Sequence, residues 1–165
     1  SFRSGTDRNT EIYKVAGLLS RDGKVRTITG DTIFQLNSTP TDSLYVVVEH
    51  RNHMGVMSPV KMCAAHANNG VICVDFTRTQ SFITGTPATS GQKILGTDSR
   101  GPIYGMHSGD GDCNFDINSS DFVPFGTDFN KFDIYSPGDF NMDCDCNSND
   151  LPKWLGNFNQ FSGVR

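Results

Sequence analysis

The sequence predicts a mainly β protein, an antiparallel and jelly-roll-like β-sandwich followed by a C-terminal pair of acidic loops with short helices. Two observations lead to this prediction. Short runs rich in β-branched and aromatic residues alternate with turn residues in the first half of the chain, and an acidic twelve-residue pattern occurs twice near the C-terminus. We expect an N-terminal extension over residues 1–20, the sandwich over 11–106 and the duplicated module over 107–165.

The predicted strands all precede residue 78. They are residues 11–19, 24–28, 32–36, 44–50, 55–62 and 71–77. Between them, Arg21–Lys24 and Asn68–Gly70 have the composition of tight turns, and the second should join a hairpin. Residues 78–106 are rich in Thr, Gly and Ser, which predicts an irregular surface loop.

The two acidic stretches begin 29 residues apart, the first at Asp110 and the second at Asp139. In each, side chains that carry oxygen stand at positions 1, 3, 5, 7, 9 and 12, the spacing with which a twelve-residue loop surrounds one Ca2+ ion. Calcium prefers oxygen ligands, whereas zinc prefers nitrogen and sulfur, and neither loop contains His. The pattern therefore predicts two bound Ca2+ ions.

The repeat continues beyond each loop without a gap, over residues 122–132 and 151–161. Apolar residues recur there with the rhythm of one helical face, and Ser119 and Ser148 stand where N-caps are expected. Early prolines and following glycines should keep both helices short. The apolar positions are Phe122, Phe125, Phe129 and Phe132 in the first repeat, and Leu151, Trp154, Phe158 and Phe161 in the second.

A duplicated loop and exit helix, with no helix entering either loop, resembles the dockerin family, whose pattern is Asp-x-Asn-x-Asp-Gly-x-(Val/Ile)-Asn-x-x-Asp. The resemblance covers residues 109–161. It implies that Asp116 and Asp145 bind through their backbone carbonyls and that the other ligands bind through their side chains. The implied ligands are Asp110, Asp112, Asn114, Asp116 and Asp121 in the first loop, and Asp139, Asn141, Asp143, Asp145 and Asp150 in the second.

The chain departs from the dockerin pattern at two places. Position 6, normally Gly because the loop turns sharply, is Phe115 in one loop and Cys144 in the other, which predicts backbone strain. Positions 10 and 11, often a Ser-Thr pair that contacts cohesin in dockerins, are Ser-Ser at residue 119 and Ser-Asn at residue 148. The second departure weakens the case for a cohesin partner.

A second resemblance covers residues 12–161. The segment from Tyr45 to Ser58, preceded by Leu18-Leu-Ser-Arg-Asp-Gly23 and followed by Val74-Asp-Phe-Thr77, is similar to a C-terminal module of secreted and surface proteins of the Bacteroidota. In that module the β segment is also followed by acidic calcium-type repeats. The resemblance implies an extracellular or cell-surface location and a structural or adhesive role.

The charge distribution also favours bound cations. Eight of the 18 acidic residues lie in the two loops, and the chain carries a formal net charge of −4. Without cations, four carboxylates in one loop would repel one another. Two bound Ca2+ ions would bring the formal charge close to zero, and a molecule with little net charge associates more readily with its own copies.

The sequence does not suggest an enzyme, because it contains none of the common nucleophile, phosphate-binding or zinc-protease motifs. His50 and His53 are the most tempting pair. On a strand, residues i and i+3 point to opposite faces, so we expect these rings to stay apart unless a bulge intervenes, and to have structural roles.

Five cysteines in an exported protein allow disulfides. Cys63 could pair with Cys73 across the predicted hairpin. Cys113 could pair with Cys144 if the two loops lie side by side, joined by a short bridge between their position 8 residues, Ile117 and Cys146. Reduced, buried thiols are the alternative. Short motifs at Thr32, Ser43 and Asn37 suggest glycan acceptors.

These observations leave three functional classes, of which the third is the accessory end of an exported enzyme whose catalytic region lies outside this chain. The leading one is an extracellular, calcium-stabilised structural subunit that forms a homo-oligomer or helical polymer, such as a surface filament, layer or adhesin, by adding the strand within Ser1–Leu19 to a neighbouring copy. The alternative is a calcium-dependent module that docks a protein or carbohydrate as part of a larger secreted protein or enzyme. Scattered basic residues disfavour nucleic acid, and no apolar run is long enough to span a membrane.

Overall fold

The computed structural model describes residues 1–20, 23–36, 43–62, 72–84 and 88–164. The chain divides into two compact units: Ser1–Val46 with Val60–Cys73, and Val47–Pro59 with Val74–Arg165. Strands are short and every described ladder is antiparallel. The mainly β prediction is therefore confirmed, whereas the jelly-roll-like sandwich stays a prediction.

The first unit is built from short strands: β1 (Phe2–Ser4), β2 (Glu11–Tyr13), β3 (Leu18–Leu19), β4 (Val25–Arg26) and the start of β5 (Leu44–Val48). Strand β1 lies between β2 and β5, where Phe2 pairs with Tyr13 on one side and with Val46 on the other. A separate two-stranded ladder joins β3 to β4. The N-terminal strand thus has partners of its own chain at both edges.

Two predicted strands are wrong. Residues 32–36 form no strand, and Ile33 is exposed. Residues 72–77 form none either, because the Asp75 carboxylate accepts the N–H of Thr77 at 2.9 Å and closes a local turn. Such side-chain bonds compete with the bonds of a ladder. The turn predicted at Asn68–Gly70 lies outside the described residues.

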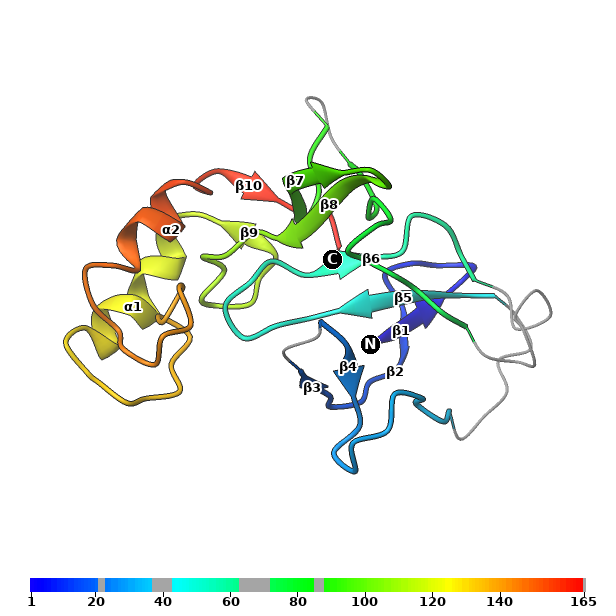
Figure 1. The fold of residues 1–165 in the computed structure, drawn as a ribbon, viewed down its shortest axis with the longest axis horizontal. Helices are drawn as coiled ribbons and strands as arrows, with labels where there is room; N and C mark the ends of the chain where they lie inside the picture. The colour runs from blue at the N-terminus through cyan, green and yellow to red at the C-terminus, as the bar shows by residue number, and fades with distance from the viewer. Residues whose placement is uncertain (21–22, 37–42, 63–71, 85–87, 165) are drawn as a thin grey trace. The chain divides into compact units, whose positions relative to one another are not determined.

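The second unit contains the longest ladder of the described chain, a hairpin of β7 (Gln92–Asp98) and β8 (Gly101–Met106) (Figure 1). The surface loop predicted for residues 78–106 is therefore wrong over its second half. Asp98 accepts the Arg100 N–H at 2.8 Å, and Gly101 has a φ of 110°, so these two residues close the turn. The end of β5 also pairs with β6 (Val56–Met57).

The C-terminal part of this unit contains β9 (Asp116–Ile117), η2 (Ser119–Asp121), α1 (Phe122–Asp128), α2 (Leu151–Leu155) and β10 (Gln160–Phe161). Both helices are short, as predicted. Asn118, not Ser119, is the N-cap residue, and it caps η2, which leads into α1, because its side chain accepts the N–H of Ser120. No helix in the described ranges is long and apolar enough to cross a bilayer.

A small aromatic core joins the two helices. Phe125, Phe140 and Cys146 are buried together, and the ring of Trp154 packs against them from α2. The rings of Phe122 and Trp154 are 5.5 Å apart between centroids, so α1 and α2 lie side by side (Figure 1). The predicted apolar face is shorter than expected: α1 ends at Asp128, and Phe129 and Phe132, which follow it, are exposed.

Candidate metal centre

The first acidic loop brings three predicted ligands together. Oxygen atoms of Asp110, Asp112 and Asp121 lie within 4.8 Å of one another. Asp110 and Asp121 are almost fully buried, whereas Asp112 is exposed. The side-chain amide of Asn114 donates to Asp112 Oδ2 at 3.0 Å, which places a fourth predicted ligand beside the cluster. Asp116 lies in β9, and its side chain is not part of the cluster.

The second loop resembles the first, but Asn and Asp exchange places at positions 3 and 5, which are Asn141 and Asp143 here. Asp139 and Asp150 are fully buried, and the Asn141 side chain donates to Asp143 Oδ2 at 2.8 Å. No second cluster of three carboxylates as tight as the first occurs in the described residues, because position 3 is an amide here. The Asp145 carboxylate accepts the N–H of Asp133 at 3.2 Å, so this side chain points out of the loop.

One hydrogen-bond network is repeated in both loops. The position 1 carboxylate accepts the N–H groups of positions 5 and 6, and the position 12 carboxylate accepts the N–H of position 9. The distances are 3.0, 3.1 and 2.7 Å for Asn114, Phe115 and Asn118, and 3.1, 3.1 and 2.9 Å for Asp143, Cys144 and Asn147. Backbone groups thus orient the buried carboxylates before any ion binds.

The backbone of the two loops also matches. Residues at positions 4 and 6 have positive φ in both: 59° and 70° at Cys113 and Phe115, and 61° and 74° at Met142 and Cys144. Residues other than Gly rarely adopt such angles. The strain predicted at position 6 is therefore confirmed, and it extends to position 4.

The buried carboxylates carry a cost that a cation would remove. Burial, followed by the charge of Asp121, raises the pKa of Asp110 to about 7. Burial also raises the pKa of Asp121 and that of Asp139 above the usual value. A divalent ion at either loop would stabilise the charged form of these groups.

The two repeats are joined by crosswise backbone pairing, in which each loop pairs with a segment of the other repeat. Ile117 of the first loop pairs with Gln160, which follows the second helix, and Cys146 of the second loop pairs with Lys131, which follows the first helix. The predicted bridge between Ile117 and Cys146 is therefore wrong. Each loop pairs with the segment that leaves the other repeat.

Sequence reasoning missed the contribution of the β5–β6 connector, residues 49–55. Arg51 Nη2 lies 3.2 Å from Asp139 Oδ2, and the Asn52 side chain donates to the backbone carbonyl of Asp139. On the first loop, the Cys113 thiol lies 3.3 Å from the carbonyl of Arg51. A Cβ added to Gly55 would overlap the ring of Phe115. No local pattern signals these contacts, because they join residues far apart in the sequence.

The prediction that the rings of His50 and His53 stay apart is wrong, because the two residues lie in the connector and not on a strand. Strand β5 ends at Val48, so His50 and His53 are not on a regular strand, and their rings meet edge to face with centroids 4.9 Å apart. His53 Nδ1 lies 2.8 Å from Asn52 Oδ1. These contacts place both rings within the connector.

The chemistry of the donor groups fits a hard cation. The groups that converge are carboxylate and amide oxygens, the ligands that Ca2+ prefers. The Cys113 thiol points instead to the connector, and the Cys146 thiol lies in the aromatic core. Soft sulfur ligands, which would favour zinc, are therefore directed away from the carboxylates.

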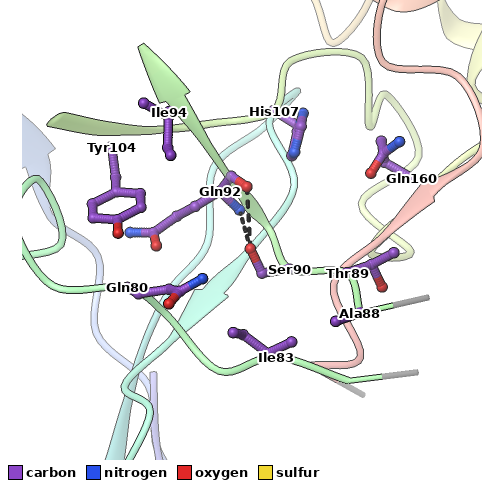
Figure 2. Close-up of a pocket in the computed structure, with 10 residues that line it drawn as sticks. All are labelled: Gln80, Ile83, Ala88, Thr89, Ser90, Gln92, Ile94, Tyr104, His107 and Gln160. Carbon is purple, nitrogen blue, oxygen red and sulfur yellow. Dashed lines mark hydrogen bonds between the residues drawn. The ribbon is translucent and has the colours of Figure 1, made fainter. Parts of the chain in front are cut away.

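A hollow of about 270 Å³ lies elsewhere in the second unit, beside β7 (Figure 2). Two of the polar side chains that line it, those of Gln92 and His107, are engaged in hydrogen bonds of the fold. Gln92 accepts the Ser81 N–H and donates to the Phe76 carbonyl, both at 2.6 Å, and His107 Nδ1 lies 3.1 Å from Asn157 Oδ1. We assign this hollow no ligand.

The remaining predicted sites are only partly described. Cys73, Cys113, Cys144 and Cys146 are free thiols in the structure, so the predicted Cys113–Cys144 disulfide is absent. Cys63 and the glycan acceptor Asn37 lie outside the described residues. Of the other two acceptors, Thr32 is exposed and Ser43 is half-buried.

Comparisons with protein-family models, curated proteins and solved structures gave no match to this chain. The interpretation of the loops therefore depends on their own residues and geometry.

Proposed function

We propose that this chain is an extracellular, non-enzymatic structural module whose two acidic loops bind Ca2+ and thereby stabilise its C-terminal part. The observation that carries the proposal is the repeated network, in which the same loop positions orient two buried carboxylates in each loop. Random acidic loops expose their carboxylates to water and have no reason to share angles and bonds at equal positions.

Calorimetric titration of the chelator-treated chain with Ca2+ tests the metal sites. We expect two bound ions, with affinities in the range of extracellular modules, about 10⁻⁴–10⁻³ M or tighter. Asp121→Asn and Asp150→Asn should each remove one ion, because position 12 supplies a ligand to its own loop alone. Absence of binding at millimolar Ca2+ would overturn the proposal.

Self-assembly is the second part of the proposal. Charge neutralisation by two ions would bring the formal net charge of −4 close to zero, which favours contacts between copies. Strand β1 has only three residues and pairs with β2 and β5. A β1 from a neighbouring copy could make the same pairs by strand exchange.

Sedimentation and electron microscopy of the chain with and without residues 1–19 test this step. We expect the shortened chain, which lacks β1, β2 and β3, to keep its second unit folded and to stay monomeric, while the full chain forms oligomers or filaments in Ca2+. Equal assembly of both chains would exclude exchange of the N-terminal strand.

The second candidate is a calcium-dependent docking module. Ser119, Ser148 and Asn149 are exposed where the helices begin, at the positions through which dockerins contact their partner. A docking module stays monomeric in Ca2+ until its partner is added, so the sedimentation experiment separates the two candidates.

A further inference from the structure

The two acidic loops differ in their contacts with a positively charged side chain, that of Arg51, which belongs to neither loop. The guanidinium of Arg51 pairs with Asp139 at position 1 of the second loop, at 3.2 Å. The Arg51 side chain is 15% exposed and that of Asp139 is 0% exposed, so little water screens the pair. Among the described residues, Asp110, Asp112 and Asp121 of the first loop have no salt bridge to Lys or Arg.

The guanidinium is fixed in this position. Its central carbon lies 3.7 Å from the centre of the Tyr135 ring, a cation–π contact. The side-chain amide of the neighbouring Asn52 donates to the backbone carbonyl of Asp139. The backbone carbonyl of Asn52 accepts the N–H of Gly109 at 2.9 Å. Arg51 is therefore held against the loop by packing on one side and by the connector backbone on the other.

Arg51 leaves room for an ion. Both carboxylate oxygens of Asp139 accept an N–H of the loop at 3.1 Å, Oδ1 from Asp143 and Oδ2 from Cys144, and Arg51 contacts Oδ2. An ion bound through Oδ1 would then have the guanidinium as a neighbour of like charge. Each loop has four Asp residues, and Arg51 adds a positive charge beside position 1 of the second loop, whereas Asp110, at position 1 of the first loop, has no salt bridge to Lys or Arg among the described residues.

We propose that Arg51 is a built-in counter-ion of the second loop, which stabilises this loop without its ion and makes it bind Ca2+ more weakly than the first. The inference rests on the proposed function. An interaction that stabilises the ion-free state more than the ion-bound state lowers the affinity for the ion, and here the bound state is weakened by repulsion between the guanidinium and the ion. The second loop then loses its ion first as Ca2+ falls, and the module unloads in two steps.

Two exposed ligands allow each loop to be titrated separately in the full chain. Asp143→Ala disables the second loop and Asp112→Ala disables the first. Calorimetry should give a Kd for the second loop that is about three- to tenfold higher than that of the first. If the two loops bound Ca2+ with equal affinity in these chains, which retain Arg51, or if the second loop bound it more tightly, the inference would be overturned.

Removal of the charge provides the direct test. In the Asp112→Ala chain, Arg51→Gln should lower the Kd of the second loop about three- to tenfold, whereas Arg51→Lys, which keeps the charge, should leave it nearly unchanged. In the Asp143→Ala chain, Arg51→Gln should not change the Kd of the first loop. The matched control is Arg100→Gln, which removes an exposed Arg that pairs with Asp98 in the hairpin turn.

Thermal unfolding in chelator gives a second readout. Arg51→Gln should lower Tm by several degrees more than Arg100→Gln without Ca2+, and this difference should shrink when Ca2+ saturates the chain. An unchanged or weaker affinity of the second loop in Arg51→Gln would exclude the counter-ion role. Absence of any Ca2+ binding in the unmodified chain would instead overturn the proposed function itself.

Discussion

Position 6 of each loop carries a side chain at a backbone angle that suits Gly. The two residues differ in what the side chain contributes. Phe115 has a φ of 70° and its ring packs over Gly55, whereas Cys144 has a φ of 74° and is exposed. The strain at Phe115 is therefore offset by a contact with the connector, and the strain at Cys144 has no such compensation in burial.

Gly substitutions at these two positions should have opposite effects. Cys144→Gly should stabilise the chain by about 1 kcal/mol, because it relieves the positive φ and removes an exposed side chain. Phe115→Gly should destabilise it by about 1 kcal/mol, since the lost packing exceeds the same relief. Urea unfolding in excess Ca2+ measures both. Destabilisation by Cys144→Gly would show that the Cys144 side chain contributes to stability although it is exposed.

His53 should make stability depend on pH. Burial lowers the pKa of His53 to about 3, and the charges of His50, Lys93 and Arg51 act in the same direction. The unfolded chain, with a His pKa of 6.5, then binds the proton more readily than the folded chain between these two values. Stability is full above pH 6.5 and is lost as the pH falls.

We expect His53 to account for a loss of about 2 kcal/mol between pH 7 and pH 5. Urea unfolding in saturating Ca2+ at both pH values gives this loss, and His53→Gln should reduce it. The comparison isolates His53 because His50, His107 and the loop carboxylates remain in both chains. Equal losses in the two chains would refute the assignment.

At the scale of elements, the crosswise ladders make the two repeats interdependent. Asn159 leaves the second repeat and donates its N–H to Ile117 of the first loop, and Asn130 leaves the first repeat and donates to Cys146 of the second loop, both at 2.8 Å. Both Asn residues have positive φ, 64° and 63°, which Asn tolerates better than most residues. An ion bound in one loop should therefore order the exit segment of the other repeat.

Substitution of these asparagines should have crossed effects. Asn159→Ala should weaken Ca2+ binding by the first loop, and Asn130→Ala should weaken binding by the second, each by about fivefold, since Ala costs about 1 kcal/mol at this φ. Titrations in the Asp143→Ala and Asp112→Ala chains identify which loop is affected. If each variant instead weakened the loop that precedes it in the sequence, the crosswise coupling would be excluded.

The elements that sequence could predict are those specified by nearby residues. The loop spacing from Asp110 to Asp121, the short helices and the strain at Phe115 all follow from local patterns, and the structure has them. Local patterns failed where distant partners decide. The β7–β8 hairpin is anchored by Arg78, which pairs with Asp98 at 2.7 Å, and Arg51 meets Asp139 only through the tertiary fold.

At the scale of the whole molecule, the loop carboxylates are unevenly distributed between the two units. The eight loop carboxylates all lie in the second unit, while the β1–β2 sheet belongs to the first. Calcium should therefore act on part of the molecule and not on the whole. Its loss leaves the buried carboxylates of Asp110 and Asp121 without a counter-ion in the second unit, and the aromatic core beside Phe125 and Phe140 lies between the two helices that follow the loops.

Chelation should loosen residues 110–161 selectively. At a free Ca2+ concentration 100-fold above Kd, each ion contributes about 2.7 kcal/mol, and this contribution disappears in EDTA. Hydrogen exchange followed by mass spectrometry should show faster exchange in the loops and helices, while exchange in β1 and β2 stays the same. Replacement of EDTA by its calcium complex is the control. Uniform acceleration over the chain would show that the ions stabilise both units together, and unchanged exchange in the loops would show that they stabilise neither.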